Sequence, residues 1–279
     1  MNTLRDCLKN ERGCVADQPQ PVASSSTHRK FEASCGWSRT TQPRSGIFRQ
    51  ALRFILPVAL VIGFASLGGA QTSDYPPAAK EYIEWCDSWI SHANETNLPR
   101  VLLIGDSITR AYYPEVEKHL EGKAYVGRLA TSAFISDPVF PKQIEMILSQ
   151  YKFDVIHFNN GMHGWQHDEK AYAEALPKLL KAIKKYAPNA KLIWANTTPL
   201  KVSPNLPPDN QMQATDERIA ARNQIAEKLM QAEGIPVDDL NTPMRGHPEF
   251  HSDNVHFNDQ GIAIQAAQVA ASVEKLLNH

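Results

Sequence analysis

The chain has 279 residues, with 29 lysines and arginines against 30 aspartates and glutamates, and 42% of its residues are hydrophobic. This composition is typical of a globular protein with a sizeable core and excludes a disordered or collagen-like chain. The formal net charge of −1 argues against nucleic acid as a partner, because phosphate recognition needs a concentrated basic surface.

The charge is divided unevenly along the chain. Residues 1–70 have a local charge of +5, whereas residues 71–279 have a charge of −6. Within the basic part, three arginines precede the uncharged apolar run 54–65, and small residues follow it at Gly68 and Ala70. This order is typical of a secretory signal peptide.

We therefore predict a signal peptide over residues 44–70, cleaved near Ala70, and export to the periplasm or the extracellular space. A membrane anchor is the alternative, but the apolar run is shorter than the roughly 20 residues that a span needs. No stable membrane anchor is expected after cleavage. Residues 1–43 are polar and aperiodic, and we interpret them as a disordered or wrongly assigned extension that is not part of the fold.

The mature chain is predicted to be one domain over residues 71–279. Its first patterned segment is 78–90. Apolar side chains recur there at helical spacing, so the pattern predicts a helix that buries Cys86. Cys86 is the one cysteine after residue 70, which excludes an internal disulfide in the mature chain. We interpret it as a structural thiol rather than a nucleophile.

Short apolar runs then alternate with amphipathic stretches, as in βαβ units around a parallel sheet. The expected strands are 101–104, 124–129, 154–158, 191–196 and 235–238, and the expected helices lie near 110–120, 141–150, 169–187, 214–233 and 259–277. The predicted fold class is α/β, a three-layer α/β/α sandwich with a flavodoxin-like, five-stranded parallel sheet. Functional groups of such a sheet gather at the carboxyl ends of its strands.

Two motifs flank this sheet at opposite ends of the sequence. Gly105-Asp106-Ser107 follows the first expected strand and places a hydroxyl at a helix N-terminus, where a serine is also a common cap. Asp253 and His256 precede the last helix with a spacing that can bring a carboxylate against one imidazole nitrogen. Together they predict a hydroxyl, an imidazole and a carboxylate at one edge of the sheet.

This pair of motifs resembles the GDSL-like or SGNH hydrolases, and the resemblance covers nearly all of the mature chain in block order. Ile108 stands where many members of that family have leucine. The resemblance implies the SGNH hydrolase fold, with Ser107 as nucleophile, His256 as general base and then acid, and Asp253 as the group that orients the histidine.

The oxyanion donors of that family are less well matched. Besides the Ser107 N–H, Ser132 falls nearest the place of the second-block glycine, whose backbone N–H donates. His163 stands in the third block where the family has asparagine, and a neutral imidazole N–H can donate there. Asn160 is the alternative donor if the turn is offset by one residue.

Other residues near these blocks have two interpretations. Asp106, Trp165 and Thr197 are candidate substrate contacts, with Trp165 either exposed for stacking on a sugar ring or an acyl group, or buried in packing. His163 and His167 could be read as a metal pair, but no accompanying cluster has zinc-site spacing. His157, His247 and His251 are interpreted as loop or packing residues.

The resemblance thus implies a serine esterase that works through an acyl-enzyme and needs no cofactor. The substrate would be a small-molecule or glycan ester, and O-deacetylation of a carbohydrate fits export and the acidic mature chain. Two alternatives stay open: an O-acyltransferase on the same triad, and a non-catalytic domain that only binds glycan. A flavodoxin-like cofactor binder is excluded because the sequence lacks a phosphate-binding glycine motif.

Overall fold

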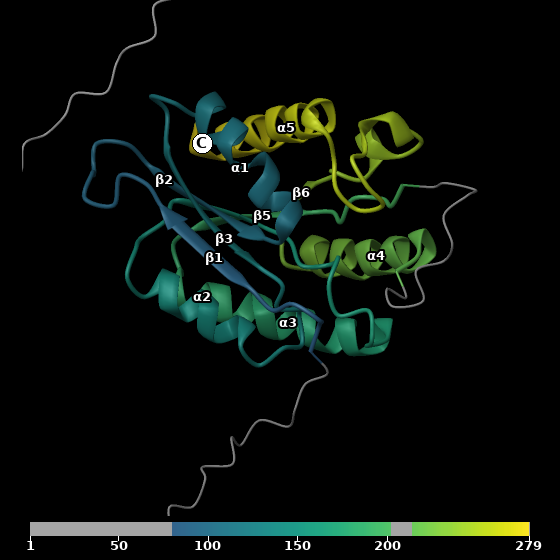
Figure 1. Cartoon of the computed structure of the whole chain (residues 1–279). Coiled ribbons are helices and arrows are strands. Elements are labelled where there is room, and N and C mark those ends of the chain that lie inside the picture. Colours follow the sequence, from purple (N-terminus) through teal and green to yellow (C-terminus); the bar gives the residue numbers. More distant parts are fainter. Residues whose placement is uncertain (1–79, 202–213, 279) are drawn as a thin grey trace, which may run out of the picture. The chain divides into compact units, whose positions relative to one another are not determined.

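The computed structural model describes residues 80–201 and 214–278 (Figure 1). In this part of the chain six strands form one sheet in the order β1-β3-β2-β4-β5-β6. They are β1 (Cys86–Ile90), β2 (Arg100–Gly105), β3 (Tyr125–Thr131), β4 (Val155–Phe158), β5 (Lys191–Ala195) and β6 (Val237–Asp238). β1 is antiparallel to β3, and all other neighbouring strands are parallel.

The inner strands form because most of their residues are apolar and buried, as expected for a sheet covered on both faces. In β2, Val101 and Leu103 point to one core, and Leu102 and Ile104 point to the other. All four side chains are fully or almost fully buried. A run of this kind can only be stable when helices pack on both sides.

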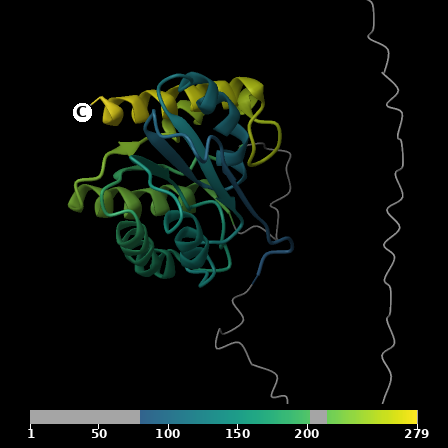
Figure 2. The ribbon, with the colours of Figure 1, turned by 90° about the vertical axis from the view of Figure 1, so that its left-hand side faces the viewer.

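Five α-helices in the described residues supply these layers: α1 (Ser107–His119), α2 (Phe140–Leu148), α3 (Glu169–Tyr186), α4 (Asp216–Ala232) and α5 (Asp259–Leu277). α1 and α5 lie together on one face of the sheet, and α2 and α3 lie on the other face, where α3 packs against α4 (Figures 1 and 2). Two short 3₁₀ helices, η1 (Thr242–Met244) and η2 (Pro248–Phe250), connect β6 to the last helix. The predicted three-layer α/β/α architecture is confirmed.

The five predicted strands and the five predicted helices all form, each within a few residues of its expected bounds. The predicted helix over 78–90 is wrong, because residues 86–90 form the edge strand β1 and pair with β3 from Cys86↔Thr131 to Ile90↔Gly127. The thiol of Cys86 is exposed rather than buried. Helical spacing of apolar residues gave a false signal here, since Tyr82 and Trp89 are themselves exposed.

The predicted extension 1–43 and signal peptide 44–70 lie outside the described residues. Within the two described ranges, no helix is both long enough and apolar enough to cross a membrane.

The order of the parallel strands places a topological switch point between β2 and β4. The chain runs from β2 through α1 to β3 on one side and later reaches β4 on the other side. In a doubly wound sheet the loops that follow two such strands diverge and leave a crevice at their carboxyl ends. Ser107 follows β2 and His163 follows β4, so both predicted site residues lie at this crevice.

Candidate active site

Ser107 is the first residue of α1, directly after β2. Asp106 caps the helix, and its carboxylate accepts a hydrogen bond from the Ile108 N–H at 2.9 Å. The Ser107 N–H belongs to the first turn, where backbone N–H groups have no partner inside the helix and the helix dipole favours negative charge. The strand and the cap therefore fix a partly exposed hydroxyl beside an anion-binding backbone.

The loop 251–258 before α5 carries the second motif. An isolated β-bridge between His251 and Phe257 closes the loop, and the Asn258 side chain caps α5 by accepting from the N–H groups of Gln260 and Gly261. Glycine is required at 261, because a Cβ atom there would lie 2.8 Å from the Phe250 carbonyl oxygen. Since α5 packs against α1, this loop is held beside the start of α1.

These two elements bring Ser107, His256 and Asp253 together. The Ser107 Oγ lies 2.8 Å from His256 Nε2, and His256 Nδ1 lies 2.8 Å from Asp253 Oδ2. The other oxygen of Asp253 accepts from the N–H groups of Val255 and His256, both at 2.7 Å. Burial would raise the pKa of Asp253, but these backbone hydrogen bonds and the imidazole hold it below its ordinary value.

The predicted oxyanion residue His163 lies in the loop between β4 and α3, on the other side of the crevice. Its backbone is held by Arg222 of α4, whose Nη1 donates to the carbonyl oxygens of Gly161 and His163, both at 2.9 Å. Arg222 Nη2 donates to the carbonyl of Gly164 at 3.2 Å. The Arg222 side chain is only 1% exposed, and burial lowers its pKa to about 10.

The side chain of His163 is held by Glu81. Both carboxylate oxygens of Glu81 lie 2.8 Å from His163 Nδ1, and Oε1 also accepts from the Gly164 N–H at 3.3 Å. Burial would raise the pKa of Glu81, but the bond to His163 and its charge lower it. Glu81 belongs to residues 80–85, a segment that we call the N-terminal strap because it binds the loops after β3 and β4.

Ser132, the predicted backbone donor, is engaged by this strap. Its N–H donates to the Trp85 carbonyl at 3.1 Å, and its Oγ accepts from the Trp85 N–H at 2.8 Å. These bonds continue the pairing of β1 with β3 beyond the strand. The N–H that was expected to face an oxyanion is therefore used by the main chain of the strap.

Asn160, the alternative donor, connects two loops. Its side-chain Nδ2 donates to the Ala133 carbonyl at 2.8 Å, and its main-chain carbonyl accepts from the Tyr172 hydroxyl at 2.9 Å. The residue is buried, so its amide holds the loop after β4 against the loop after β3.

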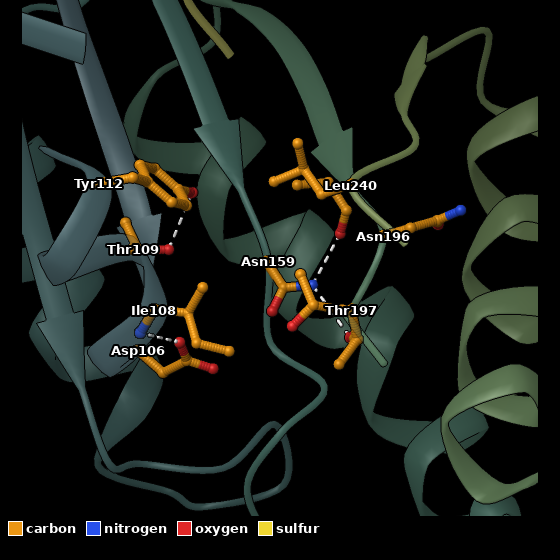
Figure 3. A pocket seen from close by; sticks show the side chains of 10 residues that line it. Asp106, Ile108, Thr109, Tyr112, Asn159, Asn196, Thr197 and Leu240 are labelled. Atoms are coloured by element: carbon orange, nitrogen blue, oxygen red, sulfur yellow. Dashed lines mark hydrogen bonds between the residues drawn. The ribbon is translucent and has the colours of Figure 1, made fainter. Parts of the chain in front are cut away.

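Asp106 and Thr197, two of the predicted substrate contacts, line a pocket under the start of α1 (Figure 3). Asn159 points into the same region and donates to Ala195 and to the Thr197 hydroxyl, as the dashed lines show. The pocket has a volume of about 10 Å³, which is near the space of one water molecule and too small for an acyl group. Asp106 caps α1 and Thr197 accepts from Asn159, so both side chains hold the loops at this edge of the sheet, and their predicted contact with substrate stays a prediction.

Trp165 takes the packing role of its two interpretations. It is 5% exposed and lies under the guanidinium of Arg222, with the Arg222 Cζ 3.8 Å from the ring centroid. A sugar ring cannot stack on a face that is already covered in this way. The predicted role in substrate stacking is therefore corrected to packing beneath the His163 loop.

The other histidines named in the sequence analysis make contacts of their own. The His167 ring packs on Phe134, and His157 forms a buried contact with Asp238. His247 and His251 pack against Phe250 and Phe257. Among residues 80–201 and 214–278, no group of three or more His, Cys, Asp or Glu side chains is placed to hold a metal ion.

Sequence reasoning missed two residues of this site. Glu81 is separated from His163 by 82 positions, and no local pattern predicts that contact. Arg222 lies in the middle of an amphipathic helix, where arginines are usually solvated. Its place on the buried face of α4 was the available signal. From sequence alone, a single arginine there could not be told from an ordinary surface charge.

Comparison with known proteins adds the family context. Residues 103–264 match the model of the GDSL-like lipase/acylhydrolase family. Among curated proteins no match was found.

Solved structures are similar in fold. A GDSL-like lipase from Bacteroides thetaiotaomicron has 17% identity and a TM-score of 0.53, covering 63% of this chain and 88% of its own. A carbohydrate acetylesterase from Sinorhizobium meliloti has 14% identity and a TM-score of 0.52, covering 64% and 99%. A carbohydrate esterase family 3 protein from Talaromyces cellulolyticus has 17% identity and a TM-score of 0.51, covering 65% and 99%.

Proposed function

Since the chain belongs to the GDSL-like lipase/acylhydrolase family, we propose that it is an exported serine esterase that hydrolyses carboxylic esters through an acyl-enzyme. The observation that carries this proposal is the chain of two 2.8 Å contacts from Ser107 to His256 and from His256 to Asp253. A hydroxyl, an imidazole and a carboxylate in this order are the parts that nucleophilic acyl transfer needs.

In the proposed reaction, Ser107 Oγ attacks the ester carbonyl while His256 Nε2 takes the hydroxyl proton. Asp253, bound to Nδ1, fixes the ring and stabilises the imidazolium that forms. His256 then gives the proton to the leaving alcohol. In the second half of the reaction His256 takes a proton from a water molecule, the water attacks the acyl-enzyme, and His256 returns the proton to Ser107 Oγ as the acid leaves. The Ser107 N–H at the start of α1 and the His163 side chain are the proposed donors to the oxyanion.

The proposed substrate is an O-acetyl group on a carbohydrate. The acidic charge of residues 71–279 and the predicted signal peptide favour an extracellular glycan over a nucleic acid. Two of the similar folds belong to a carbohydrate esterase and a carbohydrate acetylesterase, which makes this substrate class the first to test.

The test compares the purified wild-type chain with Ser107→Ala on p-nitrophenyl acetate and on acetylated xylan. We expect the wild type to release acetate from both and Ser107→Ala to release none above background. An alcohol acceptor added in parallel separates hydrolysis from acyl transfer, because a transferase would yield the new ester. A folded wild type that is no faster than Ser107→Ala on either ester would refute the proposal for these substrates.

A further inference from the structure

We propose that Glu81 is a positioning residue that holds His163 as an imidazolium, so that the site has a charged Nε2–H donor facing the oxyanion. This inference rests on the proposed function, because the oxyanion forms only if Ser107 attacks an ester. It goes beyond that function by naming the residue that sets the charge and orientation of the third-block donor.

The Glu81–His163 pair is fixed by short contacts. Glu81 accepts at His163 Nδ1 with both carboxylate oxygens at 2.8 Å, so Nδ1 must carry a hydrogen. In the described residues no hydrogen bond occupies Nε2, which is therefore the nitrogen that remains for a ligand. Arg222 holds the His163 carbonyl at 2.9 Å, so both the side chain and the backbone of His163 are fixed.

The strap is anchored to the loop after β3 and to α1, which keeps Glu81 in place. Lys80 pairs with the buried Asp137 in the loop after β3. The Trp85 carbonyl accepts from the Ser132 N–H, and the Trp85 N–H donates to the Ser132 hydroxyl. The Trp85 ring centroid lies 4.8 Å from the guanidinium carbon of Arg110 on α1. Glu81 lies between these anchors and reaches the loop after β4.

The same strap removes a donor from the site. Its Trp85 carbonyl takes the Ser132 N–H, and the neighbouring Ala133 N–H donates to the Thr131 hydroxyl at 3.0 Å. With the Ser132 N–H taken, the Ser107 N–H and His163 are the proposed donors to the oxyanion. A hydrogen bond with a charged donor is roughly twice as strong as a neutral one, so a cationic His163 offsets the missing N–H.

The charges around His163 favour the imidazolium. The ionisable groups that face it are Glu81 and Glu84 of the strap and Asp106 at the start of α1, while Arg222 contacts only its carbonyl. Burial lowers the pKa of His163, but the hydrogen bond to Glu81 and the three negative charges outweigh this and raise it above its ordinary value. The positive charge is present below this raised pKa and is lost as the pH rises through it.

The first test measures the charge without using activity. The imidazole resonances of His163 are followed by NMR as a function of pH in the wild-type chain and in Glu81→Gln, and they are assigned by their loss in His163→Asn. We expect a pKa above the ordinary value of about 6.5 in the wild type and a lower pKa in Glu81→Gln. A wild-type pKa below about 6.5, or equal values in both proteins, would overturn the proposal.

The second test measures the effect on catalysis. Loss of one oxyanion donor lowers kcat by about 100-fold, which is the expectation for His163→Ala. Glu81→Gln keeps the His163 ring but removes the carboxylate that holds it as an imidazolium, so kcat should fall by about tenfold with little change in KM. In His163→Asn, which has the neutral donor of the family, the added Glu81→Gln change should alter kcat by less than about twofold.

The pH profile of activity reports the same charge on His163. The wild type should lose activity as the pH rises through the His163 pKa, Glu81→Gln should lose it at lower pH, and His163→Asn should lack this alkaline limb. The proposal is wrong if Glu81→Gln lowers kcat equally in the wild-type and His163→Asn backgrounds. If no ester is hydrolysed but the NMR shift is present, the proposed function fails while the Glu81–His163 charge assignment stands.

Discussion

Arg222 should be the residue on which the His163 loop depends most, and Arg222→Met tests this. Methionine fills much of the same volume but cannot donate to the carbonyl oxygens of Gly161, His163 and Gly164. Leaving a buried acceptor unpaired costs about 1–3 kcal/mol, so three of them cost about 6 kcal/mol. Removing the buried cation recovers part of this.

The recovered part follows from the pKa of Arg222. Burial lowers that pKa from 12.5 to about 10, and at 1.36 kcal/mol for each pKa unit this is about 3 kcal/mol. The expected net loss in the free energy of unfolding is therefore about 3 kcal/mol, a large share of the roughly 5–15 kcal/mol of a typical domain. Because His163 moves with the loop, kcat on p-nitrophenyl acetate should also fall by about 100-fold.

Urea denaturation followed by circular dichroism measures the first quantity, and initial rates measure the second. Arg218→Met is the matched control, because Arg218 also donates to this loop, at the carbonyls of Trp165 and His167, but its side chain is more exposed. We expect the control to lose less than half as much stability as Arg222→Met. Full stability and full kcat in Arg222→Met would refute the view that buried charge–carbonyl bonds hold this loop.

Two further predictions concern other parts of the fold. Asp238→Asn should lower the free energy of unfolding by about 3 kcal/mol at neutral pH, because the His157–Asp238 contact of 3.0 Å joins side chains that are only 1% and 2% exposed. Burial would raise the pKa of Asp238, but bonds from His157 and Gln268 lower it, so its contribution is present above the ordinary value of about 3.9 and is lost as the pH falls through the lowered pKa. Acid titrations of stability should therefore be flatter in Asp238→Asn, and an unchanged acid dependence would contradict this. Gly164→Ala should cost about 2 kcal/mol or more and lower kcat, since φ is +74° and the new Cβ would lie 2.6 Å from Phe134 Cβ. Gly246→Ala, with φ of +79° and open space, is the control and should cost about 1 kcal/mol; equal losses in thermal unfolding would show that the contact with Phe134 is not important.

The sheet could be predicted because its inner strands are short and mostly apolar, and such strands are distinct from the amphipathic helices between them. The edge strand β1 could not, because the side chains around Cys86 repeat at helical spacing while the main-chain pairing with Thr131 and Gly127 depends on residues about 40 positions away. Tertiary pairing outweighed the local pattern.

The site, too, has residues that the sequence predicts and residues that it does not. Ser107, Asp253 and His256 carry motifs that the chain order alone directs to one edge of the sheet. Whether the Ser132 N–H is free depends on what the strap does, and whether Trp165 is exposed depends on Arg222, so neither could be read from neighbouring residues. Contacts between side chains that are distant in sequence leave no local pattern to detect.

The most direct measurement of the central claim is to trap the acyl-enzyme and locate it. The full wild-type chain is mixed with p-nitrophenyl acetate, quenched in acid within the first turnovers and analysed by peptide mass spectrometry, with Ser107→Ala treated in the same way. We predict one acetyl group on the peptide that contains Ser107 in the wild type and none there in Ser107→Ala, which should also release no p-nitrophenol above background. An acetyl group on another residue, or equal release of p-nitrophenol by both proteins, would contradict the assignment of Ser107 as the nucleophile.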